Sequence, residues 1–413
     1  MKSDLLFNCY KILLSVYNGG ARAGRALYDN GGDKEAAIVY GVLERDVTLD
    51  YIVGKLVSKS PKPKVTVLLK LGIFLYRYSD MPQYAAADQT VELAKKAGLA
   101  GVSGFINAVV RASGGVDTEA IADGELYLSV KYSVPLFYVR KLAEYPQGAE
   151  AVLRARPQKL THIRRNARLI SEQDFDAAAA GYLKSPAGFY ADADFLSRYG
   201  KDSRFIVQSE GSVAVAYACA DRLAPERVLD ACAAPGGKAV YISERYPDSQ
   251  ITAWDIHLHR VALTEKYAAA CGASNIRAEV RDASADAPEY HEAFDLALCD
   301  VPCTGSGVAY SKPDIFLNMT EDGLRNLAQI QSAILSAVAK YVKRGGVLVY
   351  STCSLIPDEN EGVADAFIAA HPEYAYEPLD TFYPEYADNA GKITFFPVEG
   401  GREGFFAARF RKL

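Results

Sequence analysis

Two cysteines that lie far apart in the sequence each follow an apolar, strand-like run. Cys303 ends the segment Phe294-Asp-Leu-Ala-Leu-Cys-Asp-Val-Pro-Cys303, and Cys353 ends the segment Gly346-Val-Leu-Val-Tyr-Ser-Thr-Cys353. Upstream of both lies a glycine-containing turn, Val228-Leu-Asp-Ala-Cys-Ala-Ala-Pro-Gly-Gly-Lys238, of the kind that holds a nucleotide cofactor. One thiol beside such a turn indicates a nucleophile. Two thiols indicate a nucleophile and a second group that helps a covalent intermediate to break down.

The glycine-containing turn follows a predicted strand and leads into a predicted helix. Small side chains let the backbone approach a ligand, and the amides at the start of the helix favour an electron-rich or anionic group. The spacing matches neither the dinucleotide motif G-x-G-x-x-G nor the P-loop motif G-x-x-x-x-G-K-[ST]. The residues that we expect to contact a cofactor here are Cys232, Ala233, Ala234, Pro235, Gly236, Gly237 and Lys238.

Three aspartates end three successive predicted strands. Asp255 ends the second strand, where a carboxylate accepts hydrogen bonds from ribose hydroxyls in nucleotide-binding α/β folds. Asp282 ends the third, where it would accept from an adenine amino group, and Asp300 ends the fourth. Such sheets bind ligands in the crevice beyond the carboxyl ends of their strands. The turn and the aspartates together predict an adenosine-containing cofactor that lacks a phosphate chain.

The elements that must position these residues follow an α/β pattern. From about residue 206, short apolar runs of parallel-strand length alternate with helix-length segments, which predicts a doubly wound α/β domain over 206–413. We predict its parallel strands at 227–231, 251–255, 276–281, 296–300 and 347–352. The apolar tail 405–410 is predicted to be a final edge strand.

Two further domains are predicted before the α/β domain. Residues 1–115 have helical periodicity, and a proline pair in Ser60-Pro-Lys-Pro63 marks a loop between helices. Residues 120–205 mix short helices with strand candidates such as 161–169, and we expect a small α+β RNA-binding subdomain there. One predicted helix, over 65–76, places five residues on a single face: Val65, Leu68, Leu69, Gly72 and Tyr76.

Composition places this chain of 413 residues among ordinary soluble globular proteins, with 50% hydrophobic and 23% charged residues. We expect no membrane segment, because no apolar run is long enough to span a bilayer, and no signal peptide is apparent at the N-terminus. The seven cysteines contain no Cys-x-x-Cys pair, which argues against a zinc site or a disulfide framework. We therefore expect no metal and a cytosolic location.

The net charge of −5 argues against a protein whose whole surface binds a polyanion, but two local basic clusters stand out. Residues 151–171 carry six Lys/Arg and no Asp/Glu, so contact with RNA phosphates stands as an interpretation beside that of an ordinary solvated face. The second cluster consists of Lys55, Lys59, Lys62, Lys64 and Lys70.

The glycine-containing turn, Asp300-Val-Pro-Cys303 and Thr352-Cys-Ser354 together resemble the RNA cytosine-C5 methyltransferases of the NOL1/NOP2/Sun family. Three segments nearer the N-terminus look like the NusB-like helical domain that precedes the catalytic part in the RsmB (Sun) branch; they are Tyr40–Arg45, Leu71–Arg77 and Phe105–Arg111. The resemblance spans nearly the whole chain. It implies an N-terminal all-α NusB-like bundle, a small α+β subdomain and a C-terminal Rossmann-like S-adenosylmethionine-dependent methyltransferase sheet.

The resemblance also implies a reaction, the methylation of carbon 5 of a cytosine in 16S rRNA. In that chemistry a thiolate adds to carbon 6 and turns the ring into an enamine, whose carbon 5 attacks the methyl group of S-adenosylmethionine. By resemblance, Cys353 is the nucleophile, Cys303 assists release, and Asp300 contacts the base with Lys238 as its charge partner. We expect an unpaired or flipped-out cytosine, because carbon 6 is inaccessible in a stacked helix.

Three alternatives stay open at this point. DNA cytosine methyltransferases use the cysteine of the Pro-Cys pair, which here is Cys303, whereas the Thr-Cys-Ser motif favours the RNA arrangement with Cys353. A tRNA cytosine-C5 methyltransferase would use the same chemistry, although the NusB-like front disfavours it. A non-catalytic RNA-binding protein with an inactive methyltransferase fold is disfavoured by the presence of both thiols.

The segment Tyr310–Phe316 keeps the Pro-Asp of the family pattern but lacks its preceding arginines, which leaves its substrate contacts open.

Overall fold

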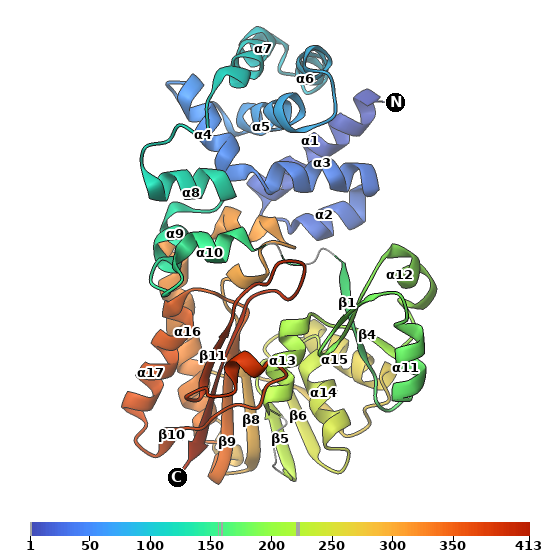
Figure 1. The fold of residues 1–413 in the computed structure, drawn as a ribbon, viewed down its shortest axis with the longest axis vertical. Helices are drawn as coiled ribbons and strands as arrows, with labels where there is room; N and C mark the ends of the chain where they lie inside the picture. Colours follow the sequence, from blue (N-terminus) through green and yellow to red (C-terminus); the bar gives the residue numbers. More distant parts are fainter. Residues whose placement is uncertain (1, 156, 158–159, 220–223) are drawn as a thin grey trace. The chain divides into compact units, whose positions relative to one another are not determined.

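The computed structural model describes residues 2–155, 157, 160–219 and 224–413 (Figure 1). The chain divides into two compact units. Unit 1 consists of Met1–Arg154 with Ala309–Met319, and unit 2 consists of Ala155–Val308 with Thr320–Leu413. None of the helices in the described ranges is long and apolar enough to cross a membrane.

Unit 1 is a bundle of helices around one central, buried helix. This helix is α5 (Pro63–Tyr78), in which every residue from Val67 to Leu75 is buried, as expected for a helix that is apolar on all sides. Gly72 lets neighbouring helices approach closely, since a Cβ there would lie 2.6 Å from a Thr90 methyl carbon and 2.9 Å from one of Val110. The helix predicted over 65–76 is thereby confirmed. The other helices are α1 (Lys2–Gly19), α2 (Ala23–Asn30), α3 (Asp33–Leu43), α4 (Asp46–Leu56), α6 (Gln83–Lys96), α7 (Ser103–Ala112), α8 (Gly124–Tyr132), α9 (Leu136–Leu142) and α10 (Gly148–Arg154).

The segment 309–319 packs within unit 1 although the chain on both sides of it belongs to unit 2. The Asp314 carboxylate accepts a hydrogen bond from the backbone N–H of Ala23, the first residue of α2, at 3.3 Å. An acid at a helix N-terminus is favoured by the helix dipole. The Phe316 ring lies 5.3 Å from the ring of Tyr138. In the structure, the Pro-Asp of Tyr310–Phe316 therefore serves to dock this segment among the helices.

The prediction of a basic cluster at Lys55, Lys59, Lys62, Lys64 and Lys70 was wrong for Lys70. This side chain is buried, and its ammonium group forms ion pairs with Asp46 at 2.5 Å and with Asp50 at 2.8 Å. A charge run in the sequence does not reveal such acidic partners, because they come from a different helix, α4. The four remaining members of the cluster are exposed: Lys55, Lys59, Lys62 and Lys64.

Unit 2 begins with a small antiparallel sheet in the strand order β2-β3-β1-β4. An aromatic core that includes Phe175, Phe189, Phe195 and Phe205 holds two short helices against it. The strand predicted over 161–169 ends earlier than expected, at Arg165. The predicted segment 120–205 is divided between the units, because α8–α10 belong to unit 1. The elements here are β1 (Thr161–Arg165), α11 (Glu172–Ala178), β2 (Leu183–Ser185), β3 (Gly188–Ala191), α12 (Ala193–Tyr199) and β4 (Phe205–Val207).

The prediction that residues 151–171 contact RNA phosphates was wrong for two of its arginines. Arg164 is buried and forms an ion pair with Glu244 at 2.9 Å, while Arg168 donates to the Ser243 hydroxyl at 2.7 Å. Both acceptors belong to the helix 237–245 of the larger sheet, so these arginines hold the small sheet in place. Arg154 is exposed, and Arg156 and Lys159 lie outside the described residues.

The larger sheet of unit 2 has the strand order β10-β12-β9-β8-β5-β6-β7, and β11 pairs with β12. Its parallel strands are the five that the sequence predicts: β5 (Arg227–Asp230), β6 (Gln250–Asp255), β7 (Ile276–Val280), β8 (Phe294–Asp300) and β9 (Val342–Thr352). The added antiparallel strands are β10 (Tyr374–Tyr376), β11 (Lys392–Phe395) and β12 (Phe405–Lys412). The α/β fold predicted for this part of the chain is confirmed.

The expectation that the tail 405–410 forms an edge strand was wrong. It forms most of β12, which lies inside the sheet between β9 and β10. Residues 405 to 410 are all buried, as is typical of an interior strand that is covered on both faces.

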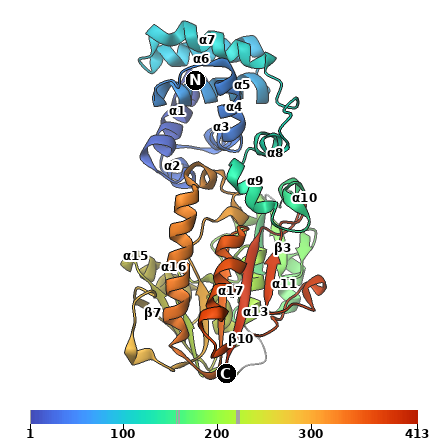
Figure 2. The same ribbon diagram turned by 90° about the vertical axis from the view of Figure 1, so that its left-hand side faces the viewer.

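Helices cover both faces of the larger sheet (Figures 1 and 2). One face carries α16 (Glu321–Ala339) and α17 (Glu361–Ala370), which pack on buried side chains such as Phe294, Tyr350 and Phe406. On the other side lie α13 (Glu210–Cys219), α14 (Gly237–Arg245) and α15 (Leu258–Ala270). This double layer leaves the carboxyl ends of the parallel strands as the place where the predicted site residues gather.

Candidate active site

The two predicted thiols meet at the carboxyl ends of β8 and β9. These strands are parallel neighbours, and their register pairs Asp300 with Ser351. Cys303 follows the end of β8 and Cys353 follows the end of β9, so both turns leave the sheet on the same side. Their Sγ atoms lie 3.2 Å apart. The structure therefore brings together the two cysteines that the sequence singles out.

The surroundings of the two thiols differ in charge. The pKa of Cys303 is raised well above its ordinary value by the hydrogen bond to Cys353, by burial and by the negative charges of Cys353 and Glu359. Cys353 instead interacts electrostatically with the ammonium group of Lys238. A neighbouring cation favours the thiolate. Of the two thiols, Cys353 is the one that interacts with the Lys238 cation.

Asp300 is held at the end of β8 by two neighbours. Its Oδ2 accepts from Lys238 Nζ at 2.8 Å, and its Oδ1 accepts from the Ser351 hydroxyl at 2.8 Å. Burial by itself lowers the pKa of Lys238, but Asp300, Cys353 and Asp230 together raise it above the ordinary value. Lys238 is therefore a cation in the site. The predicted contact between Lys238 and Asp300 is present.

The glycine-containing turn is held by hydrogen bonds to the strands on both of its sides and leads into α14. The backbone N–H of Ala231 donates to Leu298 on β8, and that of Ala233 donates to Trp254 on β6. Gly236 has φ +105°, a left-handed conformation that favours glycine, and α14 starts at the next residue. The amides at the start of this helix therefore point toward the carboxyl edge of the sheet, as the sequence predicts.

The other two predicted aspartates lie further along the same edge. Asp255 is buried at the end of β6, accepts from the backbone N–H of His257 at 3.0 Å and forms an ion pair with Arg260 at 3.3 Å. The same arginine donates to the carbonyl of Ala234 in the glycine-containing turn at 2.9 Å. Asp282 lies two residues beyond β7, is exposed, and accepts from the backbone N–H and the hydroxyl of Ser284.

Asp230 is a fourth acid of the site, which the sequence analysis missed. It ends β5 directly before the turn, is 1% exposed, and neither carboxylate oxygen has a hydrogen-bond partner among the described residues. Burial, and then the negative Asp300, raise the pKa of Asp230 to about 7. The same signal that picked out Asp255 and Asp300, an acid at the end of a strand, was present here.

The carboxylates at this edge of the sheet suit the predicted cofactor. S-adenosylmethionine carries positive charges on its sulfonium and amino groups and has no phosphate. An unpartnered buried carboxylate is costly unless a hydrogen-bond donor or a cation satisfies it. Asp230 therefore fits such a ligand, with Asp255 available for ribose hydroxyls.

Two other cysteines near the turn are not suited to nucleophilic chemistry. Burial, together with the negative charge of Asp230, raises the pKa of Cys232, and burial likewise raises that of Cys299. Both therefore remain protonated, and Cys232 contributes to the predicted cofactor turn through its backbone.

We expect Asp230→Asn to weaken S-adenosylmethionine binding and to change its pH dependence. In the wild type, ionisation of Asp230 near pH 7 should tighten binding of the cationic cofactor between pH 6 and pH 8 by about tenfold, equivalent to about one pKa unit. The variant should lose most of this increase, as measured by titration calorimetry. Equal pH profiles for the wild type and the variant would contradict this role, and the exposed Asp248→Asn serves as the control.

The same raised pKa has a consequence for stability. Between about pH 4 and pH 7 the folded protein keeps the Asp230 proton while the unfolded chain releases it, so the free energy of unfolding falls as pH rises. Asp230→Asn should therefore unfold at a higher temperature than the wild type at pH 8 without cofactor. At pH 4 the two proteins should differ less in thermal unfolding.

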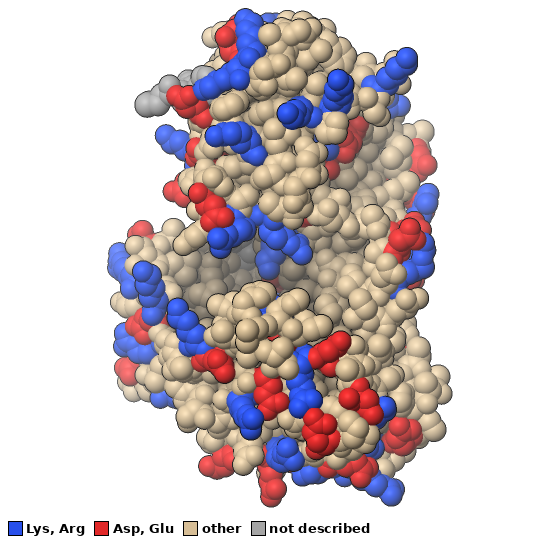
Figure 3. Space-filling model, turned by 180° about the vertical axis from the view of Figure 1, so that it is seen from behind, with Lys and Arg blue, Asp and Glu red and all other residues tan. Residues whose placement is uncertain are grey.

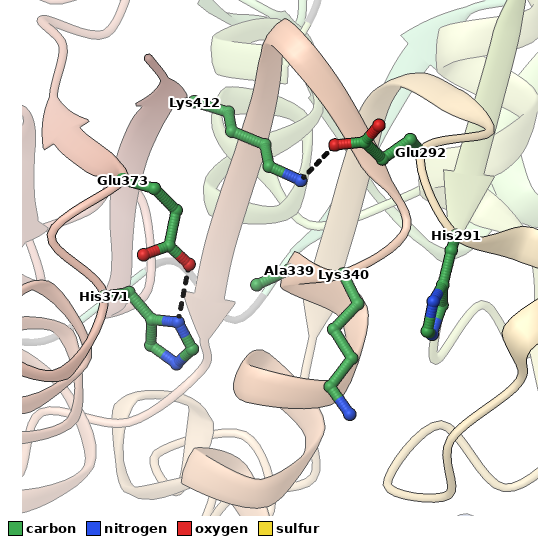
Figure 4. A pocket seen from close by; sticks show the side chains of 7 residues that line it. All are labelled: His291, Glu292, Ala339, Lys340, His371, Glu373 and Lys412. Carbon is green, nitrogen blue, oxygen red and sulfur yellow. Dashed lines mark hydrogen bonds and ion pairs between the residues drawn. The ribbon is translucent and has the colours of Figure 1, made fainter.

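A surface pocket elsewhere in unit 2 does not compete with this site. It has a volume of about 450 Å³ and lies at the amino ends of β8 and β9, the opposite edge of the sheet (Figure 4). Four of its ionisable groups pair with one another, His371 with Glu373 and Lys412 with Glu292, while His291 and Lys340 both pair with Asp286. On the face drawn in Figure 3, acidic and basic side chains are interspersed over unit 2 rather than gathered into one stripe.

Two family models match this chain. The family described as "16S rRNA methyltransferase RsmB/F" matches residues 220–411, and the NusB family matches residues 27–113. These ranges lie in the two regions that the sequence analysis separates as catalytic and helical.

Known proteins resemble the chain over nearly its whole length. The probable ribosomal RNA small subunit methyltransferase B of Bacillus subtilis is 34% identical, over 91% of this chain and 89% of its own. The ribosomal RNA small subunit methyltransferase B of Escherichia coli O1:K1 / APEC is 31% identical, over 92% and 91%. The crystal structure of PH0851 has the same fold, with a TM-score of 0.79 at 22% identity and 98% coverage of both chains.

Proposed function

Because the chain belongs to the RsmB/F family of 16S rRNA methyltransferases, we propose that it transfers a methyl group from S-adenosylmethionine to small-subunit ribosomal RNA. We further propose that the acceptor is carbon 5 of an unpaired or flipped-out cytosine. The observation that carries the second proposal is the thiol pair, Cys303 and Cys353, with Sγ atoms 3.2 Å apart beside the Lys238–Asp300 ion pair. Methylation of an exocyclic nitrogen or of a ribose oxygen needs no thiol.

Cys353 is the proposed nucleophile. Lys238 favours its thiolate, whose sulfur forms a bond to carbon 6 of the cytosine while Asp300 contacts the base. The addition makes carbon 5 electron-rich. S-adenosylmethionine supplies the methyl group, and the residues that would hold it are Asp230, Asp255, Asp282 and the turn Cys232–Lys238.

Cys303 is proposed to act after methylation. The product forms when a base removes the proton on carbon 5 and the bond between sulfur and carbon 6 breaks, which returns the thiolate of Cys353. While Cys353 is bonded to carbon it carries no negative charge, so both the hydrogen bond to its thiolate and the charge repulsion from it, which raise the pKa of Cys303, are weakened. The pKa of Cys303 therefore falls toward its ordinary value, its thiol loses a proton to solvent more readily, and the resulting thiolate accepts the proton from carbon 5.

Methylation of defined RNAs tests the function. Purified protein with methyl-labelled S-adenosylmethionine should label a 16S rRNA transcript or small-subunit particle, and digestion to nucleosides should place the label in 5-methylcytidine. Unpaired cytosine in the RNA should be preferred, and RNA binding should weaken with salt. Label in another nucleoside would contradict the cytosine assignment, and label in tRNA alone would favour the tRNA alternative.

A further inference from the structure

A buried glutamate lies between the two cysteine turns. Glu359 ends a short 3-10 helix, Pro357–Glu359, and α17 begins two residues later. The side chain is 0% exposed. A carboxylate in such a place is costly unless hydrogen bonds satisfy it, so its partners indicate what it is there to hold.

The Glu359 carboxylate accepts four hydrogen bonds, which reach both cysteine turns. Oε1 accepts from the backbone N–H of Thr304 at 2.8 Å and from Gln331 Nε2 at 2.9 Å. Oε2 accepts from the Thr304 hydroxyl at 2.5 Å and from the Ser354 hydroxyl at 2.6 Å. Thr304 directly follows Cys303, and Ser354 directly follows Cys353. One carboxylate thus joins the residues next to the two thiols.

Neighbouring contacts extend this connection. The Ser306 and Ser354 hydroxyls lie 3.1 Å apart, and the backbone N–H of Gly307 donates to the Cys353 carbonyl at 2.9 Å. Gln331, besides its bond to Glu359, donates to the carbonyl of Pro302 at 2.9 Å. The turn that carries Cys303 is therefore held from both its ends.

We propose that Glu359 is a positioning residue that ties Thr304 to Ser354 and so fixes the spacing between the Cys303 and Cys353 thiols. Under the proposed function, on which its catalytic meaning rests, this spacing keeps Cys303 within reach of a base that is bonded to Cys353. Loss of the carboxylate separates the two turns, and release of the methylated product slows more than formation of the adduct.

Two substitutions of Glu359 distinguish the effect of its hydrogen bonds from the effect of its negative charge. Glu359→Gln keeps the network, because its amide oxygen accepts from the Thr304 N–H and Gln331, and the Thr304 and Ser354 hydroxyls rotate to accept from its amide nitrogen. Glu359→Ala removes all four acceptor contacts. The matched control is Glu361→Ala. Glu361 lies two residues away from Glu359, and its carboxylate accepts a hydrogen bond from the Thr394 hydroxyl at 2.8 Å instead.

The first measurement tests the spacing between the Cys303 and Cys353 thiols in the absence of RNA. Phenylarsine oxide bridges two adjacent thiols: arsenic forms a bond to each sulfur, and both thiol protons leave with the arsenic-bound oxygen as one water. In the wild type, intact-mass and peptide analysis should show one phenylarsenic group joining Cys303 and Cys353, and Cys303→Ser should lose it. Glu359→Ala should bridge at least about tenfold more slowly, while Glu359→Gln and Glu361→Ala stay within about threefold of the wild type.

The second measurement reads the reaction. Glu359→Ala should lower kcat by at least about tenfold with little change in the KM for RNA, and should accumulate protein–RNA adduct; Glu359→Gln should restore turnover. Bridging by phenylarsine oxide needs no RNA, so the two proposals can fail separately. If the wild type forms the bridge but methylates no RNA, the proposed function is contradicted and the spacing role of Glu359 is not. Unchanged bridging in Glu359→Ala would overturn the spacing role itself.

A milder variant keeps the test decisive if Glu359→Ala does not fold. Thr304→Val removes one hydroxyl donor at nearly constant volume and leaves Glu359 its other three contacts. Circular dichroism should show a folded protein that bridges more slowly than the wild type. Bridging at the wild-type rate in a folded Thr304→Val, together with loss of turnover in Glu359→Gln, would overturn the proposal.

Discussion

Replacing Cys353 by alanine is expected to abolish methyl transfer to RNA. Without this thiolate no group in the site adds to carbon 6, and carbon 5 of cytosine remains too weak a nucleophile to attack the methyl donor. We expect kcat to fall by at least about 10³-fold, which corresponds to about 4 kcal/mol of lost transition-state stabilisation. S-adenosylmethionine binding should stay within about threefold of the wild type, because the cofactor residues are intact.

Methyl-group incorporation under single-turnover conditions measures this effect. The control is Cys271→Ala, which changes a buried cysteine at the end of α15, away from the thiol pair. Turnover near the wild-type rate in Cys353→Ala would contradict the nucleophile assignment.

Replacing Cys303 by alanine is expected to trap the reaction after the covalent step. Cys353 can still add to cytosine, but the group that removes the proton from carbon 5 is missing, so the bond between sulfur and carbon 6 persists. A protein–RNA adduct should therefore survive a denaturing gel. It should accumulate to at least about ten times the wild-type level, while multiple turnover is lost.

The opposite pattern would reverse the two roles. If Cys303→Ala forms no adduct and Cys353→Ala accumulates one, the chain uses the arrangement of the DNA enzymes. The charges around the thiols favour the first outcome, since Lys238 lies near Cys353 and the Glu359 carboxylate lies near Cys303.

The main features of the fold could be predicted because their patterns are local. Each parallel strand is a short apolar run between helix-length segments, and the acid or thiol that follows it marks the edge where ligands bind. The position of β12 could not be predicted in this way. Whether an apolar run lies at an edge or inside a sheet depends on which strands pair with it, and the two strands that pair with the outer side of β12, β10 and β11, have only three and four residues.

The site was predictable where a residue's role follows from its place on a strand, and not where it depends on a distant partner. The family resemblance implied that Lys238 is the charge partner of Asp300, and the two side chains do meet at one edge of the sheet. Lys70 and Arg164 were read as surface charge, although each is neutralised in the interior by acids from another element. Glu359 gave no signal, because its function is defined by hydrogen bonds to two separate turns.

The most direct test of the covalent mechanism is to identify the bond in the trapped adduct. Cys303→Ala should be incubated with 16S rRNA and S-adenosylmethionine, digested with nuclease and protease, and analysed by mass spectrometry. The account predicts one modified peptide, which contains Cys353 and carries a cytidine nucleotide with an added methyl group. A nucleotide on any other residue, a base other than cytosine, or no adduct at all would contradict it.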